Sequence, residues 1–128
     1  MDDPDTRYYA FKLFPPRPSF PADITEQEAA IMAEHVAYWT ELLNAGVAVA
    51  FGPVADPAET WGLAVVEAGP GTDVNALREH DPVIRRGLGA RIEIYPMPNA
   101  VVRTRPPTDP GHDAVDRAGR AEPSVTAR

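Results

Sequence analysis

The order of apolar segments along this 128-residue chain predicts an α+β domain of the βαββαβ type. Segments rich in apolar, aromatic or β-branched residues, at 7–14, 47–54, 61–66 and 90–97, are typical of strands. A capped segment with helical periodicity follows the first strand, and a shorter one precedes the last. Two such halves folded together give a four-stranded antiparallel sheet with two helices on one face, which is the ferredoxin-like arrangement.

The first half of the chain carries clear start and stop signals. The strand at 7–14 ends at a stiff, extended loop that contains Pro15, Pro16, Pro18 and Pro21. Thr25 and Glu28 then have the spacing of a capping box, in which each side chain bonds a free backbone N–H. The sequence therefore predicts a helix from residue 26 to about Asn44, closed by Gly46.

A histidine lies on the apolar side of this helix. At about 100° per residue, His35 falls between two apolar groups, which are Ala29, Met32, Val36, Trp39 and Leu43 on one side and Ile31, Tyr38 and Leu42 on the other. An ionisable group on a buried face needs a partner, because its desolvation is otherwise costly. We therefore expect His35 to point inward and to have a polar partner.

The two middle strands are apolar on both faces. The segments 47–54 and 61–66 are joined by a short turn around Pro57, which favours an antiparallel hairpin. Neither segment shows the alternation of a strand with one wet face. A second copy of the chain is the simplest cover for the other face of the sheet, so we expect a homodimer. The alternative is that small alanine side chains are tolerated in water.

Between this hairpin and the last strand, Thr72 or Asp73 is expected to cap a helix that runs to about Glu79. The Asp81-Pro82 pair follows and predicts a further turn, since aspartate before proline is a common turn starter.

Composition divides the chain into a folded domain, 1–100, and a tail, 101–128. The tail has four prolines and no aromatic, leucine or isoleucine residue, so it cannot bury enough apolar surface to offset its ordering entropy. We expect a flexible, proline- and arginine-rich segment or, alternatively, one that folds on a partner.

Charge and cysteine content exclude several classes of function. Residues 1–100 carry fifteen acidic and seven basic side chains, and such an acidic body repels nucleic acid. Without cysteine the chain has no thiolate nucleophile, thiolate metal site or disulfide. The acidic N-terminus does not resemble a signal peptide, and no apolar run reaches the roughly 20 residues of a membrane span, so we expect a soluble cytoplasmic protein.

The order of four motifs resembles the YCII-related family. They are the helix segment 35–43, the strand end Phe51-Gly52-Pro53, the apolar strand 62–67 and the turn 81–88, which reads DPVIRRGL. Phe51 replaces the small residue common at its position, and Val83 replaces the usual phenylalanine after Asp-Pro. The resemblance covers roughly residues 7–100 and leaves the tail unexplained.

This resemblance implies a dimeric α+β barrel like that of the muconolactone isomerase group. The best-understood relatives are enzymes of small-molecule degradation such as chloromuconolactone dehalogenases. A histidine–aspartate pair is regarded as the active site of the family, and by position these residues are His35 and Asp81.

A histidine–aspartate pair suits proton transfer beside a carbonyl group. An imidazole exchanges protons near neutral pH, and a bonded carboxylate fixes its tautomer. We therefore predict a cofactor-independent enzyme of the lyase or isomerase type, which isomerises, cyclises or eliminates from a small carbonyl or lactone compound. His35 is the acid or base, and Asp81 orients it.

Two alternatives stay open. His35 and Asp81 can simply satisfy a buried hydrogen bond and a turn, or the dimer can bind a small molecule or stabilise a partner without catalysis.

Six aromatic residues are candidates for a substrate pocket between the first helix and the sheet: Tyr9, Phe11, Tyr38, Trp39, Phe51 and Trp61. Aromatic residues at these spacings are more often plain core. No metal is expected, because the three histidines share no metal-binding spacing and cysteine is absent.

Overall fold

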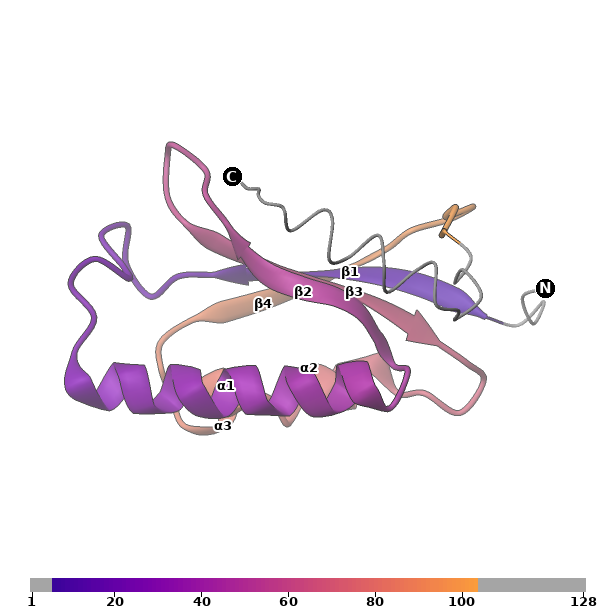
Figure 1. Cartoon of the computed structure of the whole chain (residues 1–128), viewed down its shortest axis with the longest axis horizontal. Coiled ribbons are helices and arrows are strands. Elements are labelled where there is room, and N and C mark those ends of the chain that lie inside the picture. The colour runs from indigo at the N-terminus through magenta and orange to yellow at the C-terminus, as the bar shows by residue number, and fades with distance from the viewer. Residues whose placement is uncertain (1–5, 104–128) are drawn as a thin grey trace, which may run out of the picture.

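The computed structural model describes residues 6–103, which have the predicted order of elements. The strands are β1 (Arg7–Phe14), β2 (Ala48–Val54), β3 (Trp61–Ala68) and β4 (Arg91–Pro96), and the helices are α1 (Glu26–Asn44), α2 (Val74–Glu79) and α3 (Pro82–Arg85). The helices all lie on one face of the sheet (Figure 1). The expected α+β, ferredoxin-like fold is therefore confirmed, with the turn after Asp81 forming the short additional helix α3.

The expected flexible tail, 101–128, lies outside the described residues except for 101–103. Among the helices between residues 6 and 103, none has the length and apolar content needed to cross a membrane.

The four strands are antiparallel and lie in the order β2-β3-β1-β4. Phe11 of the central strand β1 pairs with Ala64 of β3 and with Ile94 of β4. Phe51 of the edge strand β2 pairs with Ala64 in turn. Directly paired residues point to the same side of a sheet, so these four side chains all face the helices.

The signals at the helix ends act as predicted. Thr25 caps α1 and exchanges two hydrogen bonds with Glu28, which completes the capping box. Gly46 follows the helix with φ +82°, a left-handed conformation that favours glycine. Of the two candidate caps for α2, Asp73 is the residue that accepts hydrogen bonds from the first turn of the helix.

The core lies between the inner face of the sheet and α1. Trp39 is 2% exposed and packs edge-on against Phe11, with ring centroids 5.5 Å apart. The buried side of α1 is rotated from the predicted one, because Val36 and Leu43 are exposed whereas Ile31 is buried.

Hydrogen bonds explain this rotation of α1. Its inner side carries three polar groups that all find partners on the α2–α3 segment. His35 and Trp39 bond the carboxylate of Asp81, and the Tyr38 hydroxyl donates to the carbonyl of Leu77. Turning the helix to bury Val36 and Leu43 would break these three bonds and remove two of the donors to the buried carboxylate of Asp81, which is unfavourable.

The sheet surface that points away from the helices has an exposed apolar residue on β3 and charged residues on β1 and β4. Leu63 of β3 pairs with Lys12 of β1, so both belong to this face, and Leu63 is 37% exposed. Glu93 of β4 also pairs with Lys12, whose Nζ lies 4.4 Å from the ring centroid of Trp61. The apolar surface of β2 and β3 is therefore exposed in a single copy of the chain, and its burial in a homodimer stays a prediction.

Candidate active site

Asp81 is fully buried at the start of α3. Its backbone is extended, and its Oδ1 accepts a hydrogen bond from the N–H of Val83 at 3.0 Å, which caps the short helix. Pro82 takes the first helical position, where its missing N–H costs nothing. The Asp-Pro pair thus forms the expected turn, and the turn directs the carboxylate into the protein.

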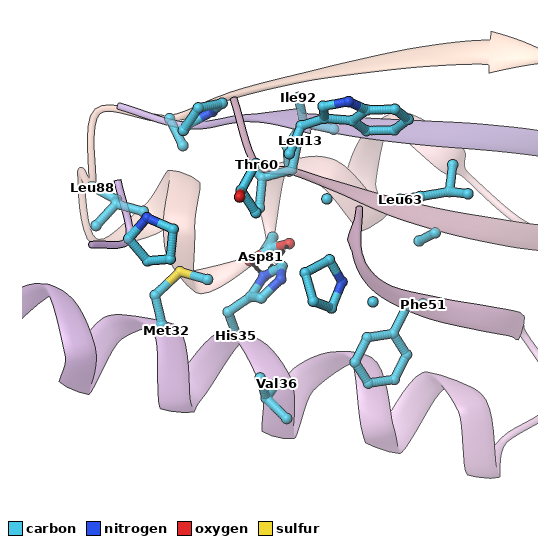
Figure 2. Close-up of a pocket in the computed structure, with 18 of the residues that line it drawn as sticks. Leu13, Met32, His35, Val36, Phe51, Thr60, Leu63, Asp81, Leu88 and Ile92 are labelled. Atoms are coloured by element: carbon cyan, nitrogen blue, oxygen red, sulfur yellow. Dashed lines mark hydrogen bonds and ion pairs between the residues drawn. The ribbon is translucent and has the colours of Figure 1, made fainter. Parts of the chain in front are cut away.

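Two side chains of α1 complete the surroundings of this carboxylate. Trp39 Nε1 donates to Asp81 Oδ2 at 2.7 Å. His35 Nδ1 lies 2.9 Å from Oδ1 and 3.0 Å from Oδ2, and Figure 2 shows the imidazole directed at Asp81. His35 and Trp39 are four residues apart and therefore share one side of the helix. The carboxylate thus has hydrogen bonds from three donors, which a buried charge needs because water cannot reach it.

These hydrogen bonds fix the tautomer of His35. The indole of Trp39 and the N–H of Val83 can only donate, so the carboxylate acts as acceptor and Nδ1 of His35 carries a hydrogen. Nε2 is then the ring nitrogen left for a ligand. Within the described part of the chain, no hydrogen bond to Nε2 is found, although the side chain is only 14% exposed.

The histidine and the aspartate line a cavity of about 350 Å³ between α1 and the sheet. This volume lies within the range of small-molecule sites. The loop after β1, the β2–β3 hairpin turn and the first half of α1 all lie at this end of the molecule (Figure 1). The wall is mostly apolar and includes Met32, Phe51, Leu88 and Ile92 (Figure 2).

Four of the six aromatic candidates line this cavity: Phe11, Trp39, Phe51 and Trp61. The other two do not. Tyr9 packs against the core on the inner face of β1, outside the cavity wall. Tyr38 donates its hydroxyl to the carbonyl of Leu77 at 2.7 Å. Burial, together with the nearby charge of Asp81, raises the pKa of Tyr38 to about 12, so its hydroxyl stays protonated at neutral pH.

Sequence reasoning missed one wall of the cavity. The loop after β1, interpreted only as a connection, contributes Pro15, Pro16, Phe20, Pro21 and Ile24. Its prolines indicate stiffness, but no local pattern indicates what a loop covers. Thr60, just before β3, is also in the wall and has no sequence signal at all.

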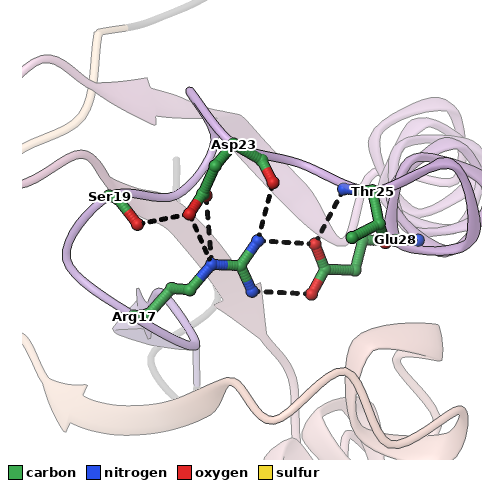
Figure 3. A network of polar contacts seen from close by, with 5 residues as sticks. All are labelled: Arg17, Ser19, Asp23, Thr25 and Glu28. Atoms are coloured by element: carbon green, nitrogen blue, oxygen red, sulfur yellow. Dashed lines mark hydrogen bonds and ion pairs between the residues drawn. The ribbon is translucent and has the colours of Figure 1, made fainter.

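Arg17 fastens this loop to the first turn of α1 (Figure 3). Its two terminal nitrogens donate to the two carboxylate oxygens of Glu28, each at 2.8 Å, and its Nε lies 3.0 Å from the Asp23 carboxylate. Ser19 donates to the same Asp23 carboxylate at 2.6 Å. Hydrogen bonds from Arg17 lower the pKa of Glu28 to about 2 and also lower that of Asp23. The loop is therefore held as a fixed wall.

The variant Arg17→Met tests this fastening. A carboxylate with a lowered pKa in the folded state stabilises the fold above its unfolded pKa and loses this effect as the pH falls through the folded value. We therefore expect Arg17→Met to lower the melting temperature at pH 7, and the difference from wild type to shrink between pH 4.5 and 2. Circular dichroism melts at pH 7, 4 and 2 measure it, with Arg85→Met as control. A pH-independent difference would contradict it.

Among residues 6–103, no arginine or lysine contributes to the cavity wall, and its only ionisable side chains in this part of the chain are those of His35 and Asp81. Within residues 6–103, no three histidine, aspartate or glutamate side chains gather in a way that could hold a metal ion. The expected absence of a metal stays a prediction.

Fold and site together define a ferredoxin-like α+β protein with a histidine–aspartate pair in the wall of an apolar cavity. The sequence matches the model of the YCII-related domain over residues 13–98. The chain therefore belongs to the YCII-related family, as its motifs indicated. A comparison with curated proteins gives no match. The family membership establishes the fold and leaves the reaction to be argued from the site.

Proposed function

We propose that this protein is a small, cofactor-independent enzyme that uses His35 and Asp81 for acid–base chemistry on a small organic carbonyl or lactone compound. One observation carries the proposal. The imidazole is bonded through Nδ1 to a buried, fully compensated carboxylate, and it also lines a cavity of small-molecule size.

The chemistry follows from this arrangement. Nε2 of His35 accepts a proton from the carbon next to the carbonyl group, and the electron pair of the broken C–H bond moves toward the carbonyl oxygen. The imidazolium that forms is stabilised by the adjacent carboxylate of Asp81. The proton then returns to another carbon in an isomerisation, a leaving group departs in an elimination, or the enolate attacks within the same molecule in a cyclisation. Positioned acid–base catalysis of this kind contributes typically about 10²–10⁴-fold.

A purely structural role explains less of the site. The hydrogen bond from His35 to Asp81 uses only Nδ1 of the imidazole ring. A structural histidine would be expected to have its second nitrogen bonded or packed, because a buried polar atom without a partner costs free energy. Here Nε2 has no partner in the described residues and the ring adjoins open space, which is the situation of a group that acts on a ligand.

Non-catalytic ligand binding is the second candidate function. It is favoured by the apolar wall, to which residues 6–103 contribute no side chain suited to acid–base work other than His35 and Asp81. In both cases we propose a homodimer paired through the exposed outer face around Leu63.

Deuterium uptake separates the two functions. Acetophenone, 2-cyclohexen-1-one and γ-valerolactone all carry exchangeable hydrogens next to a carbonyl group. We expect the protein in D₂O to speed their exchange, followed by NMR, at least about 100-fold beyond an equal concentration of free imidazole. If none of the three exchanges faster than with imidazole, the proposed catalysis is refuted and non-catalytic binding becomes the favoured function.

A further inference from the structure

We infer that the cavity selects an uncharged, largely apolar carbonyl compound, and that Thr60 binds this compound through a second hydrogen bond opposite His35. The inference rests on the proposed function, because it names the substrate class of the same site. It follows from an inventory of the polar groups in the wall.

Most polar side chains of the wall are already engaged. Both oxygens of Asp81 accept hydrogen bonds, and the indole N–H of Trp39 is one of the donors. The indole of Trp61 donates to Asp56 at 3.0 Å. Among the polar side-chain atoms that the described residues contribute to this wall, only Nε2 of His35 and the hydroxyl of Thr60 are then left without a hydrogen-bond partner.

Thr60 is placed to meet the same ligand as His35. It precedes β3 and lies on the sheet side of the cavity, whereas His35 reaches in from α1 (Figure 2). A threonine hydroxyl donates one hydrogen bond and accepts others. It can therefore hold the carbonyl oxygen while Nε2 of His35 addresses the adjacent carbon, and it can stabilise negative charge as this develops on the oxygen.

The charges around the cavity exclude an anion. The pair of His35 and Asp81 is neutral when the imidazole is protonated and carries a charge of −1 when it is not, so it never offers a net positive charge. Among the described residues, the cations Arg17, Arg86 and Lys12 do not contribute to the cavity wall. Arg17 is bonded to Glu28 and Asp23, and Arg86 is bonded to Glu34 at 2.7 Å. Lys12 lies on the opposite face of the sheet. A carboxylate in this cavity would be desolvated without a partner, which is unfavourable.

A matched set of ketones tests the charge selection. Acetophenone, methyl 4-acetylbenzoate and 4-acetylbenzoate share one skeleton, and only the last is an anion. We expect both neutral compounds to bind the full-length protein at pH 7.5, measured by quenching of tryptophan fluorescence, and the anion to bind at least about tenfold more weakly. The neutral ester controls for the size of the added group. Binding of the anion within twofold of its ester, or no binding of either neutral ketone at millimolar concentration, would overturn the inference.

The role of Thr60 is tested by Thr60→Val, which keeps the shape and removes the hydroxyl. We expect the variant to bind both neutral ketones roughly three- to tenfold more weakly. The control is Thr40→Val on α1, whose hydroxyl bonds the carbonyl of Val36 and which is outside the cavity wall. Unchanged affinity in Thr60→Val, in a variant with a wild-type melting temperature, would refute the assignment of Thr60.

Binding and turnover fail independently in these experiments. Preference for neutral ketones without deuterium uptake would refute the proposed enzyme and leave the charge selection standing. Deuterium uptake with equal binding of the anion would leave the enzyme standing and refute the selection.

Discussion

Replacing Asp81 by asparagine is expected to abolish proton transfer with almost no change in volume. Three donors point at this carboxylate, from His35, Trp39 and the backbone of Val83. An amide offers one oxygen, and its NH₂ group can donate to Nδ1 of His35. The ring then takes the opposite tautomer, with the hydrogen on Nε2, and the base facing the cavity is lost. In a catalytic triad, a wrong tautomer of this kind costs a factor on the order of 10⁴ in rate.

The same substitution is expected to destabilise the fold. Trp39 and Val83 bond different oxygens of Asp81, so the amide nitrogen must face one of these two donors. A buried donor left without an acceptor costs about 1–3 kcal/mol, measurable by urea denaturation. The matched control is Asp73→Asn at the start of α2, where asparagine caps a helix as well as aspartate does. Wild-type rate and stability in Asp81→Asn would show that the carboxylate has neither role.

His35→Ala has the second-largest expected effect, and it falls mainly on activity. Removal of the base should lower the rate of deuterium uptake by about 10²–10⁴-fold. Stability should fall by less than about 1.5 kcal/mol, because Asp81 keeps its bonds to Trp39 and Val83 and water can enter the open cavity to replace the imidazole.

The control for this variant is His80→Ala, which removes an exposed histidine next to Asp81 in the sequence. Its rate should equal that of wild type. A loss of about 3–5 kcal/mol in His35→Ala, the usual cost of breaking a buried ion pair, would instead indicate that the histidine is there to stabilise the fold.

The fold could be predicted because its signals are local. The capping box of Thr25 and Glu28, the left-handed position of Gly46 and the alternation of the strands depend on neighbouring residues only. The rotation of α1 could not be predicted in this way. A helical wheel ranks Val36 and Leu43 by their apolar character, whereas the real orientation is set by hydrogen bonds to Asp81 and Leu77, forty or so positions away in the chain.

Part of the candidate site could be predicted because two of its signals are also local. An inward histidine and an Asp-Pro turn are visible in the sequence, and the resemblance to the YCII-related family joined them. Trp39 was expected as a pocket or core residue, and its role as a donor to Asp81 was missed, because an indole N–H leaves no pattern in a sequence. That Tyr9 lies outside the wall of this cavity could not be foreseen, because aromatic content does not say at which end of the sheet a cavity opens.

The most direct test of the site is the tautomer of the His35 ring in the protein itself. Two-bond ¹H–¹⁵N NMR spectra of the ¹⁵N-labelled chain distinguish the two ring nitrogens, and His80→Ala and His112→Ala variants assign the signals. At a pH where the ring is neutral, we expect hydrogen on Nδ1 and a bare Nε2 whose resonance shifts when acetophenone is added. Hydrogen on Nε2 would contradict the proposal, because the nitrogen that faces the cavity could not then accept a proton.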